Sequence, residues 1–201
     1  MSKDYFAHKS TAYDSNPSRA DNVKNIAEGI LEAIAYTNDQ SIMDFGAGTG
    51  LLTAHIAPYV KKITTVDISP SMNEKMREKA PTLPCHIEVL HADLATENLE
   101  RIFDGIISSM TIHHIEDVQK LFHTLYSLLR SGGSLAIADL EKEDGSFHEE
   151  DTGVFHFGFE YDTFLTYAKN AGFVELQMRR VSVAHKPYGA YPIFLLTGIK
   201  P

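Results

Sequence analysis

The sequence has little of three things: cysteine, positive charge and long apolar runs. Since Cys85 is its one cysteine, the chain can form no intramolecular disulfide and no metal site made of cysteines alone. Its 18 lysines and arginines against 27 aspartates and glutamates give a formal net charge of −9. Proteins that track nucleic acid draw most of their affinity from cationic side chains, so we expect no nucleic-acid partner.

Hydrophobic segments long enough for a membrane are lacking as well. No stretch approaches the roughly 18 apolar residues needed to cross a bilayer, and the polar residues 1–19 resemble neither a signal peptide nor a transit peptide. We expect a cytoplasmic protein in a reducing compartment, with no membrane partner. Its 201 residues, 43% of them hydrophobic, suffice for one domain, 1–201, with a buried core.

Short apolar runs alternate with helical patterns along the first two thirds of the chain. Apolar residues from Val23 to Ile34 recur at helical spacing, which predicts an amphipathic helix. Apolar strands with helices between them are typical of a parallel sheet covered on both faces. The predicted strands are 41–45, 63–67, 86–90, 103–109 and 134–140, and the predicted helices between them are 51–59, 70–80 and 117–130.

The last third of the sequence has a different pattern. A helix is predicted over 161–171, and two β-type runs, 174–184 and 191–199, are joined by Lys186-Pro187-Tyr188-Gly189. A turn of that composition between two such runs is typical of an antiparallel hairpin at a sheet edge. The predicted fold class is α/β: a doubly wound, Rossmann-like, mostly parallel seven-stranded sheet with helices on both faces and an antiparallel C-terminal hairpin.

A glycine-rich loop follows the first predicted strand. Gly46, Gly48 and Gly50 stand between that strand and a helix, where glycine lets the backbone turn sharply and approach a ligand. A dinucleotide fingerprint would have its third glycine where Leu51 stands, and a phosphate loop would continue with Lys-Ser or Lys-Thr. The spacing therefore disfavours a nicotinamide-dependent dehydrogenase.

Acidic residues follow the next two predicted strands. Asp67 closes the second one, where a carboxylate can accept hydrogen bonds from both hydroxyls of a ribose. Asp93 lies just past the third, where its carboxylate can accept from an exocyclic amine while the N–H of Leu94 donates to a ring nitrogen. Together with the glycine loop, these residues predict a nucleoside-containing ligand at the carboxyl ends of the strands.

In this order the motifs resemble those of the class I S-adenosylmethionine-dependent methyltransferases. The similar stretches are 44–50, 66–69, 92–94, 112–117 and 128–135. The last two resemble the small-molecule branch of the family, which includes quinone-biosynthesis methyltransferases. One departure is Arg130-Ser131-Gly132-Gly133, at a predicted turn where the family commonly has Lys-Pro-Gly-Gly.

The resemblance implies S-adenosyl-L-methionine as cofactor and methyl transfer from its sulfonium as the reaction. It implies that the glycine loop, supported by Asp44, lies along the methionine moiety near Ser109 or Met110, and that Ile68 lies against the adenine. The predicted cofactor-binding residues are Tyr13, Asp44, Gly46, Ala47, Gly48, Gly50, Asp67, Ile68, Asp93, Leu94, Ser109 and Met110.

The acceptor side carries weaker signals. His113 and His114 after the fourth strand, and His156 between two phenylalanines, are candidate general bases, although each could instead be structural. The connection 141–160 is predicted to be an active-site lid, and residues 1–20 a cover segment. The histidines and carboxylates of the connection lack ligand spacing, so we expect no metal. Its acidic residues argue against a strongly anionic acceptor.

The sequence therefore predicts a methyltransferase that acts on a small organic molecule. The alternative is a non-catalytic protein that binds S-adenosylmethionine or S-adenosylhomocysteine as a regulator or scaffold, because cofactor motifs do not establish a base. The sequence does not determine the identity of the methyl acceptor, the atom that is methylated or the oligomeric state.

Overall fold

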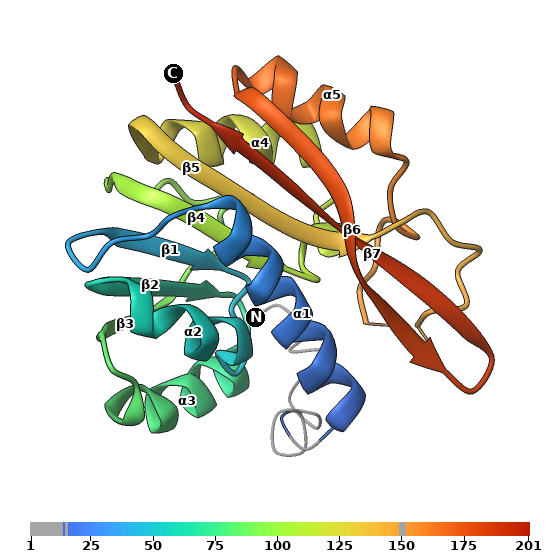
Figure 1. Cartoon of the computed structure of the whole chain (residues 1–201), viewed down its shortest axis with the longest axis horizontal. Coiled ribbons are helices and arrows are strands. Elements are labelled where there is room, and N and C mark those ends of the chain that lie inside the picture. The colour runs from blue at the N-terminus through green and yellow to red at the C-terminus, as the bar shows by residue number, and fades with distance from the viewer. Residues whose placement is uncertain (1–13, 15, 149–151) are drawn as a thin grey trace.

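The computed structural model describes residue 14, residues 16–148 and residues 152–201. Within them, seven strands form one sheet with the order β3-β2-β1-β4-β5-β7-β6 (Figure 1). The strands are β1 (Ser41–Phe45), β2 (Lys62–Asp67), β3 (His86–His91), β4 (Phe103–Ser109), β5 (Leu129–Leu140), β6 (Val174–Lys186) and β7 (Gly189–Ile199). The α-helices are α1 (Pro17–Ala33), α2 (Leu51–Ile56), α3 (Pro70–Lys79), α4 (Val118–Ser127) and α5 (Tyr161–Ala171), and 3₁₀ turns cover Ala57–Tyr59, Ala80–Thr82 and Ile112–His114.

The pairing of the strands confirms the predicted fold class. β1 is paired in parallel with β2 and β4, β3 extends the parallel part on one side and β5 on the other, and β7 is antiparallel to both β5 and β6. The chain moves outward from β1 to β3 and then returns to β4 beside β1. In open α/β sheets, ligands bind outside the carboxyl ends of the strands at such a point of reversal.

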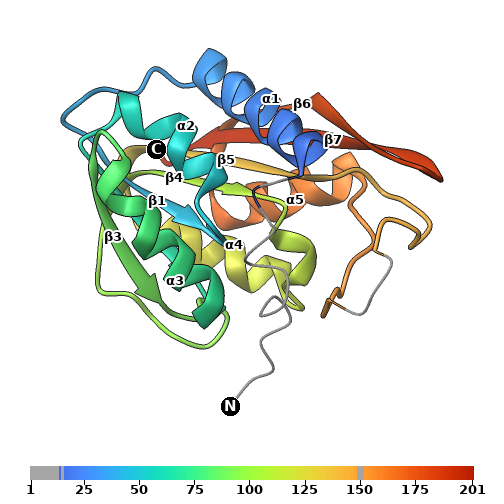
Figure 2. The same ribbon diagram turned by 90° about the horizontal axis from the view of Figure 1, so that it is seen from below.

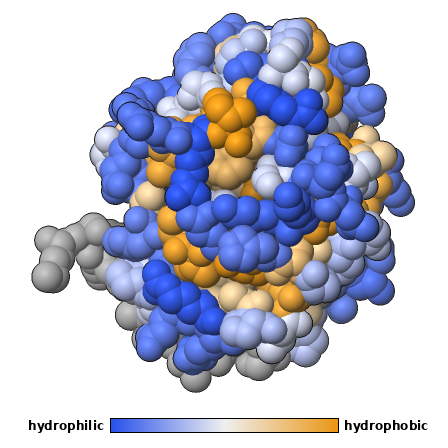
Figure 3. All heavy atoms as spheres, turned by 90° about the vertical axis from the view of Figure 1, so that its left-hand side faces the viewer, coloured by the Kyte–Doolittle hydropathy of each residue, from blue (hydrophilic) through white to orange (hydrophobic). Residues whose placement is uncertain are grey.

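Helices cover the sheet on both faces, as Figure 2 shows for α1 and α5. On one face α1 and α2 pack against the sheet, with Ile26 and Ile30 of α1 fully buried, while on the other face α4 and α5 bury Phe122 and Phe164. Full burial of each such side chain stabilises the fold by roughly 1.5–3 kcal/mol. In the described part of the chain, no helix is long and apolar enough to cross a membrane. The face on the left of Figure 1 is largely hydrophilic, with small hydrophobic patches (Figure 3).

The boundary between α4 and β5 differs from the sequence prediction. The helix ends at Ser127 rather than Arg130, and the residues expected as a turn, 130–133, belong to an irregular first part of β5. The N–H of Gly132 donates to the carbonyl of Lys200, whose own N–H donates to the carbonyl of Gly133. The end of β7 thus supplies hydrogen-bond partners that extend the strand, while Gly132 takes a positive φ of 73°.

The connection between β5 and α5 is anchored to the sheet at both ends. The N–H of Phe159 donates to the carbonyl of Leu140, and the N–H of Lys142 donates to that of Phe159. Phe159 is buried in the core beside Phe164. This phenylalanine, expected on a lid, is therefore a core residue, because the chain returns alongside the end of β5 before α5 begins.

Candidate functional site

A cavity of about 1160 Å³ opens at the carboxyl ends of β1, β2 and β4. Its walls come from the start of α1, the glycine loop, the loops after β2, β3 and β4, the described residues of 147–155 and the turn of the β6–β7 hairpin. Pockets for one small molecule usually measure roughly 300–1000 Å³. This cavity therefore has room for a cofactor and for a second molecule beside it.

The three glycines after β1 all have positive φ: 68° at Gly46, 55° at Gly48 and 81° at Gly50. A Cβ on Gly46 would lie 2.1 Å from the side chain of Thr111, and a Cβ on Gly50 would lie 2.1 Å from Sδ of Met76. A Cβ on Gly48 would meet no atom within 4 Å. The outer two glycines thus allow the loop to pack, whereas the middle one faces open space in the cavity.

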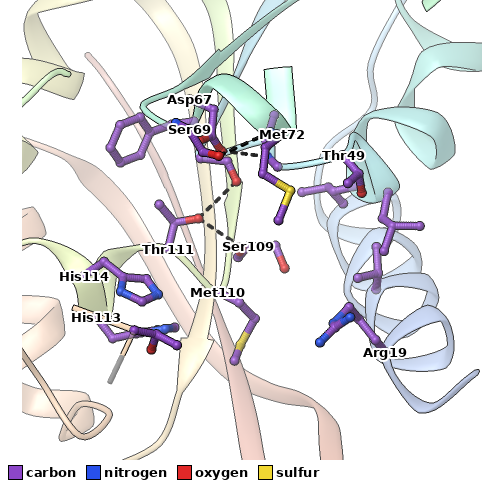
Figure 4. A pocket seen from close by; sticks show the side chains of 18 of the residues that line it. Arg19, Thr49, Asp67, Ser69, Met72, Ser109, Met110, Thr111, His113 and His114 are labelled. Carbon is purple, nitrogen blue, oxygen red and sulfur yellow. Dashed lines mark hydrogen bonds between the residues drawn. The ribbon is translucent and has the colours of Figure 1, made fainter. Parts of the chain in front are cut away.

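The carboxylate of Asp67 joins the end of β2 to the glycine loop. Its Oδ2 accepts a hydrogen bond from the N–H of Gly48 at 2.8 Å, and its Oδ1 accepts one from the N–H of Ser69, also at 2.8 Å. The hydroxyl of Ser69 in turn accepts a hydrogen bond from the N–H of Met72 and so caps the N-terminus of α3 (Figure 4). These bonds fix the orientation of the Asp67 carboxylate at the cavity wall.

Asp44 lies in the interior of β1, with 1% of its surface exposed. Its carboxylate accepts a hydrogen bond from the hydroxyl of Thr53 at 2.5 Å. Burial raises the pKa of Asp44 to about 7. Because the residue also lines the cavity, a cationic group bound there would favour its ionised form.

Met110 and Ser109 carry features that the sequence does not reveal. Met110 has a φ of 57°, a left-handed conformation that costs roughly 1–3 kcal/mol in a residue other than glycine and is concentrated at functional sites. Its side chain projects into the cavity (Figure 4). The hydroxyl of Ser109 beside it is buried and has no hydrogen-bond partner. The strained backbone of Met110 and the unpaired hydroxyl of Ser109 therefore lie next to each other at the cavity wall.

Most of the predicted cofactor residues lie around this one cavity. Leu94 is instead a core residue with 2% of its surface exposed, and neither it nor Gly50 lines the cavity. Tyr13 lies outside the described residues. The predicted residues that line the cavity are Asp44, Gly46, Ala47, Gly48, Asp67, Ile68, Asp93, Ser109 and Met110.

A buried hydrogen bond between a histidine and a carboxylate lies behind one of the predicted bases. Nδ1 of His113 is 2.6 Å from Oδ1 of Asp139, and the N–H of His113 donates to Oδ2 at 3.2 Å. Burial alone would raise the pKa of Asp139, but His113 and the hydrogen bonds lower it below its usual value. The carboxylate is therefore ionised and can only accept, so Nδ1 of His113 donates to it.

Two further histidines surround His113. Its ring centroid lies 4.4 Å from that of His114 and 5.1 Å from that of His148. Burial, and then the neighbouring His113, lower the pKa of His114 to about 4 and that of His148 to about 3. Both rings are therefore neutral at neutral pH. Nε2 of His148 is buried and has no hydrogen-bond partner.

The third predicted base, His156, is not among the residues that line the cavity. Its Nε2 lies 2.9 Å from the carbonyl oxygen of Ile115, and its ring packs against Phe159 at 5.2 Å. These contacts fit the structural alternative, because they tie the connection to the loop after β4. Among the residues that the structure describes, no group of three or more His, Cys, Asp or Glu side chains is placed to hold a metal ion.

The described acidic residues of the connection do not face the cavity. Glu141 is paired with Arg180 at 2.6 Å, Glu143 accepts from the N–H groups of Gly145 and Phe147, and Asp144 accepts from the N–H of Ser146. Residues 149–151, which include three more carboxylates, lie outside the described residues. The described carboxylates of this connection are thus no guide to the charge of the acceptor.

Several residues of the site were missed by the sequence analysis. Asp139 does not line the cavity but holds the ring of His113 from behind. It lies near the end of an apolar run, as Asp67 does, so its position was a usable signal. Arg19, His148, Lys186 and the exposed ring of Tyr188 line the cavity, but they are far apart in the sequence and belong to no motif.

Known proteins share parts of this sequence. Residues 43–137 match a family model described as a methyltransferase domain. An uncharacterised methyltransferase of Schizosaccharomyces pombe is 36% identical over 149 residues, which cover 65% of this chain and 52% of that protein. A malonyl-[acyl-carrier protein] O-methyltransferase of Ilyobacter polytropus is 36% identical over 100 residues, which cover 49% of this chain and 37% of that protein. The chain spans about half or less of the length of these curated relatives.

A solved structure shares the fold. Phosphoethanolamine N-methyltransferase 2 of Haemonchus contortus, in complex with phosphomonomethylethanolamine and S-adenosylhomocysteine, aligns with a TM-score of 0.72 at 17% sequence identity. The alignment covers 88% of this chain and 52% of that one. At this identity the likeness concerns the arrangement of strands and helices alone.

Proposed function

The chain belongs to the class I S-adenosylmethionine-dependent methyltransferase family, and on that premise we propose that it transfers the methyl group of S-adenosylmethionine to a small organic molecule. The observation that carries the proposal is the single cavity that joins the glycine loop and Asp67 to the cluster around His113. Methyl transfer requires donor and acceptor to touch, and one cavity with two chemically different ends meets that need. The name of the relative from Ilyobacter polytropus, an O-methyltransferase, supports the same reaction type.

The glycine-loop end of the cavity fits S-adenosylmethionine. The open space beside Gly48 accommodates a ligand at van der Waals distance from the backbone, and the buried hydroxyl of Ser109 needs a partner. We propose that Asp67 binds the ribose hydroxyls, that Asp44 stabilises the cofactor's ammonium group, and that the 56% exposed side chain of Ile68 packs on the adenine. When bound, the cofactor supplies a methyl group already activated on a sulfonium.

Orientation is then the main contribution of the protein. Holding the acceptor in line with the methyl group can lower the barrier by roughly 7–11 kcal/mol. A base is required only when the attacking atom carries a proton. We assign this role to His113, because Nδ1 donates to Asp139 and the ring therefore accepts a proton at Nε2, with the buried carboxylate stabilising the imidazolium.

The described residues of 147–155 support the proposed lid. Phe147, His148, Thr152 and Phe155 line the cavity, and the ring of Phe155 is 57% exposed. A bound acceptor would cover such a ring and exclude water from the reacting atoms.

Two measurements test the proposed function. Calorimetric titration with S-adenosylmethionine, S-adenosylhomocysteine and NADH should show binding of the first two and none of the third. Methyl-labelled cofactor is then incubated with a panel of small acceptors, and label should appear in one of them. Tight binding without transfer to any acceptor would favour the regulatory or scaffold alternative, and preference for NADH would contradict the family assignment of the site.

A further inference from the structure

Ionisable side chains are distributed unevenly around the cavity. Asp44, Asp67 and Asp93 lie at or just past the ends of β1, β2 and β3, together with His91 at the end of β3. The other basic side chains come from elsewhere: the first turn of α1, the loop after β4, the described part of the connection and the β6–β7 hairpin. They are Arg19, His113, His114, His148, His185 and Lys186, and Glu116 is the one other carboxylate among the described lining residues.

The basic residues form a continuous cluster. Nζ of Lys186 donates to the carbonyl of Phe147 and lies 4.4 Å from the centroid of its ring. That ring is 4.8 Å from the ring of His148, which is in turn 5.1 Å from the ring of His113. Arg19 lies across the cavity from His113 (Figure 4). The cluster therefore presents the positive charge of Lys186 beside imidazole rings that can donate or accept hydrogen bonds.

One atom of the cluster has no partner among the residues that the structure describes. Nε2 of His148 is buried without a hydrogen bond, and an unsatisfied buried polar group costs roughly 1–3 kcal/mol. Such exceptions in native proteins call for an explanation. A ligand atom that accepts or shares a proton at Nε2 would remove this cost. The connection does not supply one from Glu141, Glu143 or Asp144, since all three have other partners.

We propose that this end of the cavity binds the methyl acceptor through a negatively charged oxygen group, a carboxylate or a phosphate monoester, held by Lys186 and His148. The inference rests on the proposed function, because it assigns the acceptor half of the same cavity. The apolar remainder of the acceptor packs on Phe147 and Tyr188, whose rings line the cavity beside the cluster. A bound anion would pair with the positive charge of Lys186 and accept a hydrogen bond from Nε2 of His148.

Small aromatic probes of one size test the preference for charge. Protein saturated with S-adenosylhomocysteine is titrated calorimetrically with benzoate, phenyl phosphate, benzamide and benzylamine. At least one of the two anions should bind about tenfold more tightly than the neutral benzamide, and the comparison between them identifies the preferred oxyanion. Equal or tighter binding of benzamide or benzylamine, or no binding of either anion, would overturn the inference.

Paired variants locate the preference in the cluster. His148→Phe keeps an aromatic ring without the unpaired nitrogen, and Lys186→Met keeps most of the apolar stem without the charge. Each should reduce the preference for the anion to about twofold or less. The matched controls His123→Phe on α4 and Lys75→Met on α3, which do not line the cavity, should retain it. If both cluster variants kept the tenfold preference for the anion over benzamide, the assignment of anion binding to Lys186 and His148 would be contradicted.

A separate titration distinguishes the two proposals. Failure of the wild-type protein to bind S-adenosylhomocysteine would contradict the proposed function. Normal binding of S-adenosylhomocysteine without a preference for anions would overturn the acceptor inference alone. Thermal unfolding of each variant checks its fold. His148→Phe should unfold slightly earlier than the wild type, because it also removes Nδ1, which lies 3.2 Å from the hydroxyl of Thr152.

Discussion

Nδ1 of His113 lies 2.6 Å from Oδ1 of Asp139, and both side chains are withdrawn from solvent, with 2% and 0% of their surface exposed. A carboxylate in this position needs a permanent partner, because burial without one would favour its neutral form. The pair connects the end of β5 to the loop after β4 and fixes the ring at the cavity wall. It is both a structural contact and the support of the proposed base.

Removal of the carboxylate should therefore destabilise the protein. Asp139 accepts hydrogen bonds from Nδ1 and the N–H of His113, and a buried donor left without its partner costs roughly 1–3 kcal/mol, so Asp139→Ala should lower the free energy of unfolding in denaturant titrations by at least that amount. The control Glu32→Ala removes the exposed partner of Arg179 and should cost less than about 1 kcal/mol. Similar losses in the two variants would show that the buried pair is not special.

Asp139→Asn separates orientation from packing. Asparagine keeps the shape of the side chain, but its amide group can donate a hydrogen bond. The ring of His113 is then no longer required to carry its proton on Nδ1. Nitrogen-detected NMR of histidine-labelled protein should show Nδ1 protonated in the wild type and a changed tautomer in the variant. An unchanged tautomer would contradict the positioning role of Asp139.

Gly48→Val should abolish cofactor binding while the protein still folds. The side chain of valine would occupy the open space in the cavity. A valine backbone at the positive φ of this position also destabilises the fold by roughly 1–2 kcal/mol. Gly132→Val is a matched control, because Gly132 also has positive φ, at 73°, but does not line the cavity. Calorimetry with S-adenosylhomocysteine should detect binding to the control and none to Gly48→Val. Comparable affinity in both variants would refute the role given to the loop.

Asp67→Ala should weaken cofactor binding by roughly 1–3 kcal/mol, the range for lost hydrogen bonds to a charged group. The loss has two sources, since the carboxylate would bind the ribose and also holds the N–H of Gly48. Asp162→Ala, at the start of α5, serves as the control for removal of one negative charge. The measurement is the dissociation constant of S-adenosylhomocysteine, and unchanged affinity in Asp67→Ala would exclude the ribose contact.

The lowered pKa of His114 predicts loss of stability in acid. Its pKa is about 4 in the folded protein against an ordinary value of 6.5, so between these values the unfolded state binds more protons and stability rises with pH. Lowering the pH from above 6.5 to below 4 should therefore reduce the free energy of unfolding by roughly 3 kcal/mol. His114→Gln should flatten the pH dependence of the unfolding free energy, whereas the control His86→Gln should leave its slope unchanged. Equal slopes in wild type and His114→Gln would contradict the prediction.

The cavity wall that we propose for the cofactor was predictable as one group of residues because its signals are local. The glycine loop and Asp67 each follow an apolar strand directly, and a parallel sheet brings the ends of its strands to one edge. Gly50 and Leu94 were assigned to ligand contact because they belong to motifs, but the structure uses them for packing. The sequence pattern alone cannot distinguish a residue that contacts the ligand from one that packs behind the site.

The acceptor half was not predictable because it is assembled from distant segments. The ring of His148 lies beside that of His113, and Lys186 of the hairpin reaches the same end of the cavity by holding the carbonyl of Phe147. The boundary of α4 was wrong for a related reason. Leu128 and Leu129 continue the helical pattern of apolar residues, but pairing of Leu129 with Phe103 makes it the start of a strand.

Transfer of labelled methyl from S-adenosylmethionine tests the central claim most directly. The wild-type protein is incubated with the labelled cofactor and a panel of small carboxylates, phosphate monoesters, alcohols and amines. The account predicts label in an acceptor together with an equal amount of S-adenosylhomocysteine, and no label when Gly48→Val replaces the wild type. A wild-type protein that binds the cofactor but leaves the label on it with every acceptor would contradict the account.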